Sequence, residues 1–87
     1  MKNIIVYSSL YCPYCNAAKL LFEQKNLKFK EILIDNDSKL RSEMIGLSNG
    51  RKTVPQIFFD EFHIGGYDDL KKIDEEGKLM KFLRDYE

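Results

Sequence analysis

The residues best suited to nucleophilic and redox chemistry are two cysteines near the start of the chain. Cys12 and Cys15 are the only cysteines in the 87-residue sequence, and they enclose Pro13 and Tyr14. An apolar run at positions 4–7 precedes them and is typical of a buried strand, whereas the apolar residues after them recur at helical spacing. A Cys-x-x-Cys motif at a strand-to-helix junction indicates thiol–disulfide chemistry.

The expected helix start explains why the first cysteine is the reactive one. The first N–H groups of a helix lack internal partners, and this end carries partial positive charge. Both effects favour a thiolate at Cys12, and the thiolate is the nucleophilic form. Pro13 suits the first helical position, where a missing N–H costs nothing. We therefore predict that Cys12 is the attacking nucleophile.

The second cysteine lies one helical turn later, on the same side of the helix. This spacing allows the Cα separation of about 4.4–6.8 Å that a disulfide needs. We predict that Cys15 is more covered by the fold and acts as the resolving thiol. The alternatives are inert buried cysteines or a mononuclear zinc site. Zinc takes about four ligands, and His63 is the single histidine, so we favour the redox pair and assign no metal site.

Length and composition indicate one small domain over residues 1–87. Hydrophobic residues make up 44%, enough for one modest core, and 14 basic side chains balance 14 acidic ones. This balance gives no reason to expect nucleic acid or a membrane as a partner. The first apolar run is too short for a signal-peptide core, and no stretch resembles a transmembrane segment. We expect a cytoplasmic monomer whose cysteines form a catalytic disulfide.

The first half of the chain predicts a βαβ unit. The run at 3–7 is almost continuously apolar, as in a central strand that is covered on both faces. A helix is predicted over 13–25, with Asn26 as its C-cap because Asn tolerates the left-handed conformation. Alternating polar and apolar residues predict a second strand over 28–34. The intervening helix makes these two strands parallel.

The second half predicts a helix, a β-hairpin and a final helix. A polar turn at 35–38 supplies N-cap residues for the second helix. Strands at 56–59 and 62–64 are joined by two polar residues, as in a hairpin. The last helix opens at Tyr67 and is interrupted by Gly77. The resulting order, β-α-β-α-β-β-α, is an α/β fold with a mixed sheet and helices on both faces.

Three motifs, in the right order and at the right separations, make the sequence resemble a dithiol glutaredoxin over essentially the whole chain. They are Cys12-Pro13-Tyr14-Cys15, Thr53-Val54-Pro55-Gln56-Ile57-Phe58 and His63-Ile64-Gly65-Gly66-Tyr67-Asp68-Asp69-Leu70. Together they are far more specific than the cysteine pair alone. The resemblance implies a thioredoxin-like fold with a four-stranded mixed sheet, and glutathione as the electron donor.

The same resemblance implies a glutathione groove beside the cysteines. One wall would be the segment before the third strand, with a cis bond preceding the proline and with the backbone of Val54 paired to glutathione like an added strand. The start of the last helix would hold the γ-glutamyl carboxylate, and Asp68 would bind the γ-glutamyl ammonium group. The residues implied to bind glutathione are Tyr14, Thr53, Val54, Pro55, Gly66, Tyr67 and Asp68.

One position departs from the family pattern. Many glutaredoxins carry a Lys three residues before the first cysteine, where it helps to bind the glycine carboxylate of glutathione, and here that position is Ser9. Arg51 or Lys52 could supply the positive charge instead. We expect Asp69 to favour the helix start. His63 is expected to be structural, because the thiolate is activated by its position and needs no base.

The implied function is a glutathione-dependent thiol–disulfide oxidoreductase without a tightly bound cofactor. Its partners would be glutathione and disulfide-containing or glutathionylated proteins; ribonucleotide reductase is a common partner of similar proteins, but no residue here selects it. One alternative is a related reductase that is driven by thioredoxin reductase. Another is a [2Fe–2S] module in which two subunits bind the cluster through Cys12 and two glutathiones. The dithiol motif resembles the redox type more than the cluster-binding type, which usually has one cysteine.

Overall fold

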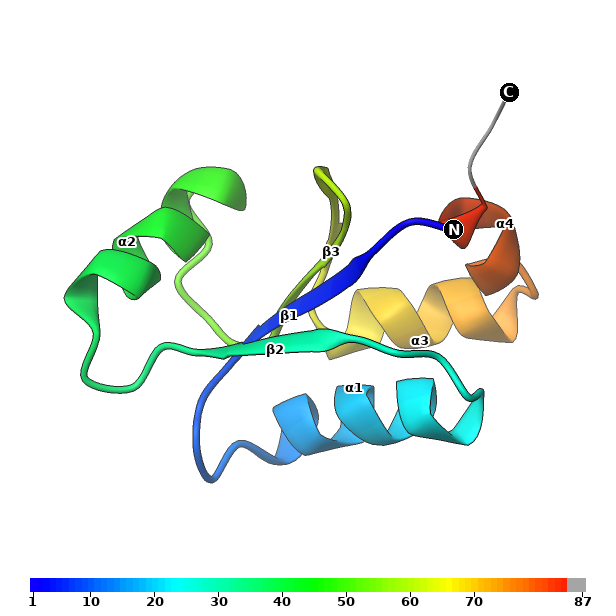
Figure 1. The fold of residues 1–87 in the computed structure, drawn as a ribbon, viewed down its shortest axis with the longest axis horizontal. Helices are drawn as coiled ribbons and strands as arrows, with labels where there is room; N and C mark the ends of the chain where they lie inside the picture. Colours follow the sequence, from blue (N-terminus) through cyan, green and yellow to red (C-terminus); the bar gives the residue numbers. More distant parts are fainter. Residues whose placement is uncertain (85–87) are drawn as a thin grey trace.

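A four-stranded mixed sheet in the order β2-β1-β3-β4 organises the chain in the computed structural model, which describes residues 1–84 (Figure 1). The elements follow the predicted order, with the last helix interrupted as expected. In chain order they are β1 Ile4–Ser8, α1 Pro13–Gln24, β2 Lys30–Leu33, α2 Ser38–Leu47, β3 Gln56–Phe59, β4 Phe62–Gly65, α3 Tyr67–Glu75 and α4 Leu79–Leu83.

Strand β1 is one of the two inner strands of the sheet, as its apolar run predicts. It pairs in parallel with β2 and antiparallel with β3, so that Val6 lies opposite Glu31 on one side and Ile57 on the other. Val6 and Ile57 are both fully buried. The antiparallel hairpin of β3 and β4 completes the sheet. The parallel first half and the antiparallel second half are therefore confirmed.

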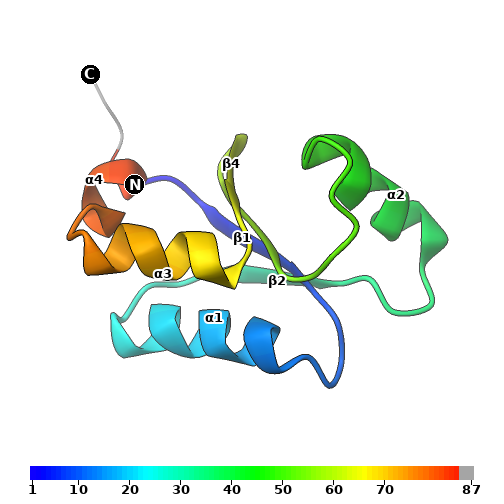
Figure 2. The same ribbon diagram turned by 180° about the vertical axis from the view of Figure 1, so that it is seen from behind.

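Helices cover both faces of the sheet and bury a separate apolar cluster on each face. Helices α1 and α3 lie side by side on one face, and α2 lies on the other (Figures 1 and 2). None of the helices within residues 1–84 is long and apolar enough to span a membrane. The cluster under α1, α3 and α4 contains Ile4, Val6, Ala18, Phe22, Ile57, Phe59, Leu70, Leu79 and Leu83. The smaller cluster under α2 contains Tyr7, Ile34, Met44 and Phe58.

Several predicted boundaries are wrong by one or two residues; among them, the strand predicted over 62–64 extends to Gly65 and the first strand ends at Ser8. The strand predicted over 3–7 begins at Ile4, because the N–H and carbonyl of Asn3 are both bonded to Asp60 at the β3–β4 turn (2.8 Å each). The strand predicted over 28–34 is reduced to Lys30–Leu33, because its pairing with β1 starts opposite Ile5. Helix α1 is capped by Lys25, and Asn26 follows with the left-handed φ of 58°.

Candidate active site

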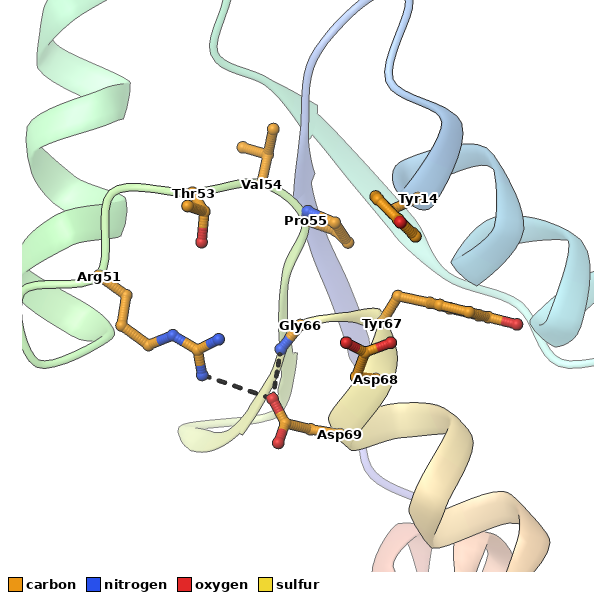
Figure 3. A pocket seen from close by; sticks show the side chains of 9 residues that line it. All are labelled: Tyr14, Arg51, Thr53, Val54, Pro55, Gly66, Tyr67, Asp68 and Asp69. Carbon is orange, nitrogen blue, oxygen red and sulfur yellow. Dashed lines mark hydrogen bonds and ion pairs between the residues drawn. The ribbon is translucent and has the colours of Figure 1, made fainter.

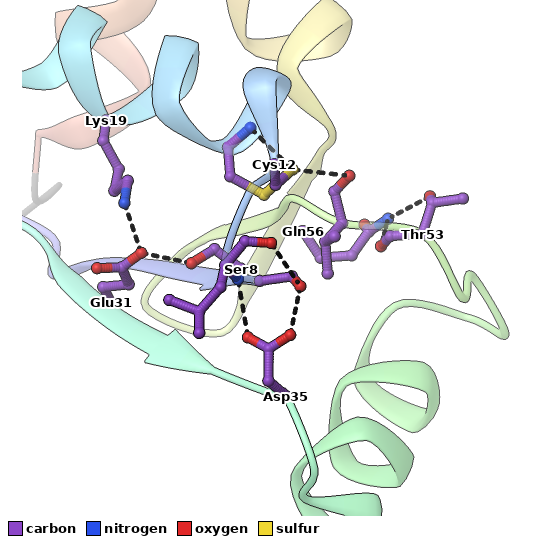
Figure 4. The surroundings of a disulfide bond; sticks show 11 residues. Ser8, Cys12, Lys19, Glu31, Asp35, Thr53 and Gln56 are labelled. Atoms are coloured by element: carbon purple, nitrogen blue, oxygen red, sulfur yellow. Dashed lines mark hydrogen bonds and ion pairs between the residues drawn. A yellow bond between two sulfur atoms is a disulfide. The ribbon is translucent and has the colours of Figure 1, made fainter.

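The two cysteines form a disulfide at the start of α1, with their Cα atoms 5.2 Å apart (Figure 4). Cys12 is the N-cap of α1 in extended conformation, and Pro13 begins the helix. Cys15 is fully buried, whereas Cys12 is partly exposed. The local sequence thus presents one sulfur to the surface and covers the other.

The sulfur of Cys12 lies among backbone groups that suit a thiolate. The N–H of Cys15 points at Cys12 Sγ over 3.1 Å. A sulfur anion at this place would accept that N–H and also experience the positive end of α1. The carbonyl oxygen of Val54 lies 3.9 Å from the same sulfur, so the loop that precedes β3 borders the reactive atom.

A pocket of about 420 Å³ opens beside the cysteines (Figure 3). Its walls come from the first turn of α1, the loop before β3 and the start of α3. The peptide bond between Val54 and Pro55 is cis, as the resemblance predicted. All the residues that the resemblance placed in the groove line this one pocket, together with two that it left outside. The lining is Tyr14, Arg51, Thr53, Val54, Pro55, Gly66, Tyr67, Asp68 and Asp69.

Charged groups of both signs border the pocket. Asp69 accepts the N–H of Gly66 at 2.9 Å, as expected of a residue that favours the helix start, and it lies 3.4 Å from Arg51 Nη1 (Figure 3). Of the two cations considered from the sequence, Arg51 lines the pocket and Lys52 does not. Asp68 makes no ion pair or side-chain hydrogen bond within residues 1–84, so its carboxylate is available to a ligand.

A chain of hydrogen bonds behind the pocket fixes Thr53. Its members belong to the motifs described above, but the sequence did not predict the bonds between them. Gln56 is fully buried, and its amide nitrogen donates to the carbonyl (3.0 Å) and the hydroxyl (3.3 Å) of Thr53. Its amide oxygen lies 2.7 Å from His63 Nε2. An amide oxygen only accepts, so Nε2 must carry the proton. Burial lowers the pKa of His63, and the charge of Arg51 lowers it further.

Two carboxylates secure the segment that carries Cys12. Asp35 accepts the hydroxyl of Ser9 at 2.6 Å and the N–H of Leu10 at 2.8 Å (Figure 4). Both hydrogen bonds lower the pKa of Asp35, and the bond from Ser9 has the larger effect. At the position where many glutaredoxins have a Lys, this chain thus has a Ser that anchors the loop leading to Cys12. Glu31 on β2 accepts Ser8 Oγ at 2.5 Å and Lys19 Nζ at 2.7 Å, which ties α1 to the sheet.

Comparison with known proteins identifies the family. The family model described as Glutaredoxin matches residues 4–64. The chain belongs to the glutaredoxin family. It is 48% identical to glutaredoxin 3 of Escherichia coli K12 over 97% of this chain and 100% of that protein. It is 45% identical to glutaredoxin 1 of Rickettsia conorii, over 95% of this chain and 82% of the relative.

Solved glutaredoxins share the fold. The crystal structure of a buckwheat glutaredoxin–glutathione complex superposes with a TM-score of 0.84 at 32% identity, covering 94% of this chain and 76% of that one. The solution structure of glutaredoxin from Brucella melitensis gives 0.83 at 43% identity, covering 95% and 89%. The thioredoxin-like fold is therefore confirmed, and this glutaredoxin is a thiol–disulfide oxidoreductase with the Cys-x-x-Cys pair at its centre.

Proposed function

We propose that this glutaredoxin uses glutathione to reduce protein disulfides and glutathione mixed disulfides, with Cys12 as nucleophile and Cys15 as resolving thiol. The observation that carries the proposal is the pocket beside Cys12, whose lining joins a backbone N–H and a carboxylate, both without a partner within residues 1–84, and a cation. Glutathione needs all three kinds of partner, because it has a peptide backbone, two carboxylates and an ammonium group.

Each part of glutathione has a partner of suitable chemistry in the pocket. The N–H of Val54 has no hydrogen-bond partner within residues 1–84, so it can pair with the cysteinyl backbone of glutathione as an added strand does. The first N–H groups of α3 suit the γ-glutamyl carboxylate, and Asp68 suits the ammonium group. Arg51 binds the glycine carboxylate in place of the usual Lys.

The proposed reaction proceeds by two thiol–disulfide exchanges. The Cys12 thiolate attacks the glutathione sulfur of a mixed disulfide, which releases the substrate thiol and leaves glutathione on Cys12. A second glutathione then releases Cys12 and forms oxidised glutathione. With a protein disulfide, Cys15 attacks the Cys12 mixed disulfide instead, and two glutathiones later reduce the resulting Cys12–Cys15 bond.

Turnover of a small glutathione mixed disulfide, coupled to glutathione reductase and NADPH, tests the proposal. The Cys15→Ser variant should keep this activity, because the resolving thiol takes no part in it, and Cys12→Ser should lose it. An active Cys12→Ser variant would contradict the nucleophile assignment. Wild-type turnover with thioredoxin reductase but not with glutathione would contradict the proposed donor.

The remaining proposals concern the context in which the enzyme works. We propose that residues 1–87 form one domain and act as a cytoplasmic monomer without a tightly bound cofactor. Glutathionylated and disulfide-containing proteins are the proposed substrates, and ribonucleotide reductase is one candidate among them. Sedimentation of the purified protein tests whether it is a monomer. Its absorption spectrum after anaerobic purification tests whether it contains an iron–sulfur cluster.

A further inference from the structure

Exposed apolar side chains lie on both sides of the reactive cysteine in the sequence. Tyr11 is 98% exposed, and Leu10 and Tyr14 are 56% and 63% exposed. All three lie within two residues of Cys12. Charged residues make up 32% of the sequence, yet none occurs from position 3 to position 18. We call Leu10, Tyr11 and Tyr14 the cysteine rim.

The backbone of Tyr11 makes its presence in the rim unusual. Tyr11 has φ 58°, in the left-handed region that large side chains rarely adopt. The other non-glycine residues with positive φ within residues 1–84 are Asn26, Asn36, Asn49 and Asp60, all of types that tolerate this conformation. With almost all of its surface in solvent, the Tyr11 ring adds nothing to the core that would offset this strain.

A strained, exposed aromatic residue beside a reactive atom points to a role in binding. A disulfide substrate must bring its sulfur to Cys12 Sγ. Neighbouring residues in an extended chain are about 3.3–3.6 Å apart. When the substrate cysteine reaches Cys12, its neighbouring residues are therefore brought close to the cysteine rim.

We propose that Tyr11 is a specificity-determining residue of this enzyme, whose exposed ring selects apolar side chains next to the attacked cysteine of a polypeptide substrate. The proposal rests on the proposed role of Cys12 as nucleophile but does not require glutathione. The pocket of about 420 Å³ and the cysteine rim share Tyr14, so the peptide moiety and glutathione occupy adjoining surfaces.

Peptides that carry a thionitrobenzoate mixed disulfide allow the docking step to be measured without glutathione. The Cys12 thiolate attacks the peptide sulfur, because thionitrobenzoate has the lower pKa and is the better leaving group. The products are the Cys12–peptide disulfide and the yellow thionitrobenzoate anion, whose release gives the second-order rate constant. Three substrates are compared: a peptide with Leu and Phe beside its cysteine, one with Ser at both places, and N-acetylcysteine.

The Tyr11→Asn variant removes the ring while keeping a residue that accepts positive φ. We expect its rate constant with the apolar peptide to fall about tenfold, equivalent to about 1.4 kcal/mol of lost contact, and to be unchanged with the other two substrates. Tyr11→Phe should behave as wild type. The matched control is Leu20→Gln, which alters another exposed apolar residue (52% exposed) two turns farther along α1.

The melting temperature adds an independent readout. Tyr11→Asn should be at least as stable as wild type, since it relieves backbone strain and removes no buried surface. Equal rate constants for Tyr11→Asn and wild type with the apolar peptide would overturn the proposal. An equal loss with all three substrates would also overturn it, because the ring would then act on the chemistry or the fold. Thionitrobenzoate release by Cys12→Ser would instead refute the nucleophile on which both proposals depend.

Discussion

Replacing His63 by Phe tests whether the hydrogen-bond chain behind the pocket positions Thr53. Phe keeps an aromatic ring on Phe58, from which the imidazole centroid is 4.9 Å away. It removes the donor that lies 2.7 Å from Gln56 Oε1. Because Gln56 is fully buried, its amide oxygen would be left without a partner.

The expected loss of stability follows from that orphaned oxygen. An unsatisfied buried acceptor costs about 1–3 kcal/mol, and each kcal/mol lowers the melting temperature of a domain of this size by about 4–8 °C. Thermal and urea unfolding of the wild type and His63→Phe measure the difference. His63→Gln restores an N–H donor at similar reach and should recover most of the lost stability.

Activity provides the second readout of the same substitution. Without its partner, Gln56 no longer holds Thr53 in one orientation, and the wall of the pocket loosens. The KM for a glutathionylated substrate should rise in His63→Phe while kcat stays near its wild-type value, because Cys12 is untouched. The reasoning would be refuted if His63→Phe matched wild type in both stability and KM, or if His63→Gln were as impaired as His63→Phe.

The pH dependence of stability gives a further test of the same residue. Burial and the charge of Arg51 lower the pKa of His63, while Asp69 acts in the opposite direction. The unfolded chain, with an ordinary His pKa of about 6.5, therefore binds a proton at a higher pH than the folded protein does. The contribution of His63 is fully present above that value and is lost as pH falls through the lower folded pKa. His63→Gln should remove this part of the pH profile.

Four other substitutions have defined expectations. Gly65→Ala should destabilise the protein by about 1–3 kcal/mol, because Gly65 has φ +122° and an added Cβ would overlap the Asp69 carboxylate; urea unfolding measures it. Gly46→Ala lies inside α2, where the added Cβ would meet no atom within 4 Å apart from its chain neighbours and the backbone of its own helix. It should instead stabilise the protein by about 0.5–1 kcal/mol, and equal effects of the two substitutions would contradict this account. Arg51→Gln should raise the KM for glutathione about three- to tenfold, whereas Lys52→Gln, outside the pocket, should not; the coupled assay with glutathione reductase distinguishes them.

The sequence by itself determined the order of the elements and the chemistry of the cysteine pair. Both depend on local information. The apolar run before Ser8 predicts a central strand. Pro13 suits the first position of a helix and therefore predicts that Cys12 lies at the helix start. Gly77 predicts the break between α3 and α4. These signals lie within a few residues of the features they specify, so a single chain without relatives is enough to interpret them.

The prediction of the groove depended on the family resemblance, and its assembly depends on tertiary structure. Tyr14, Val54 and Asp68 are far apart in sequence, and the motifs alone did not say that they line one cavity. The structure brings them together because β1 lies between β2 and β3, which sets the start of α1 beside the loop before β3 and the start of α3. The choice of Arg51 over Lys52 was likewise open, since neighbouring residues in a loop point in different directions.

Tertiary structure alone decided the contacts that hold the site in place. Gln56 and His63 belong to different strands of a hairpin whose register shifts between Ile57 and Phe58, and no motif predicts the 2.7 Å contact between their side chains. The left-handed backbone of Tyr11 was also invisible in the sequence, where Tyr predicts no such conformation. Patterns of residue type report which faces are buried, whereas individual hydrogen bonds and backbone angles arise only when distant segments pack against one another.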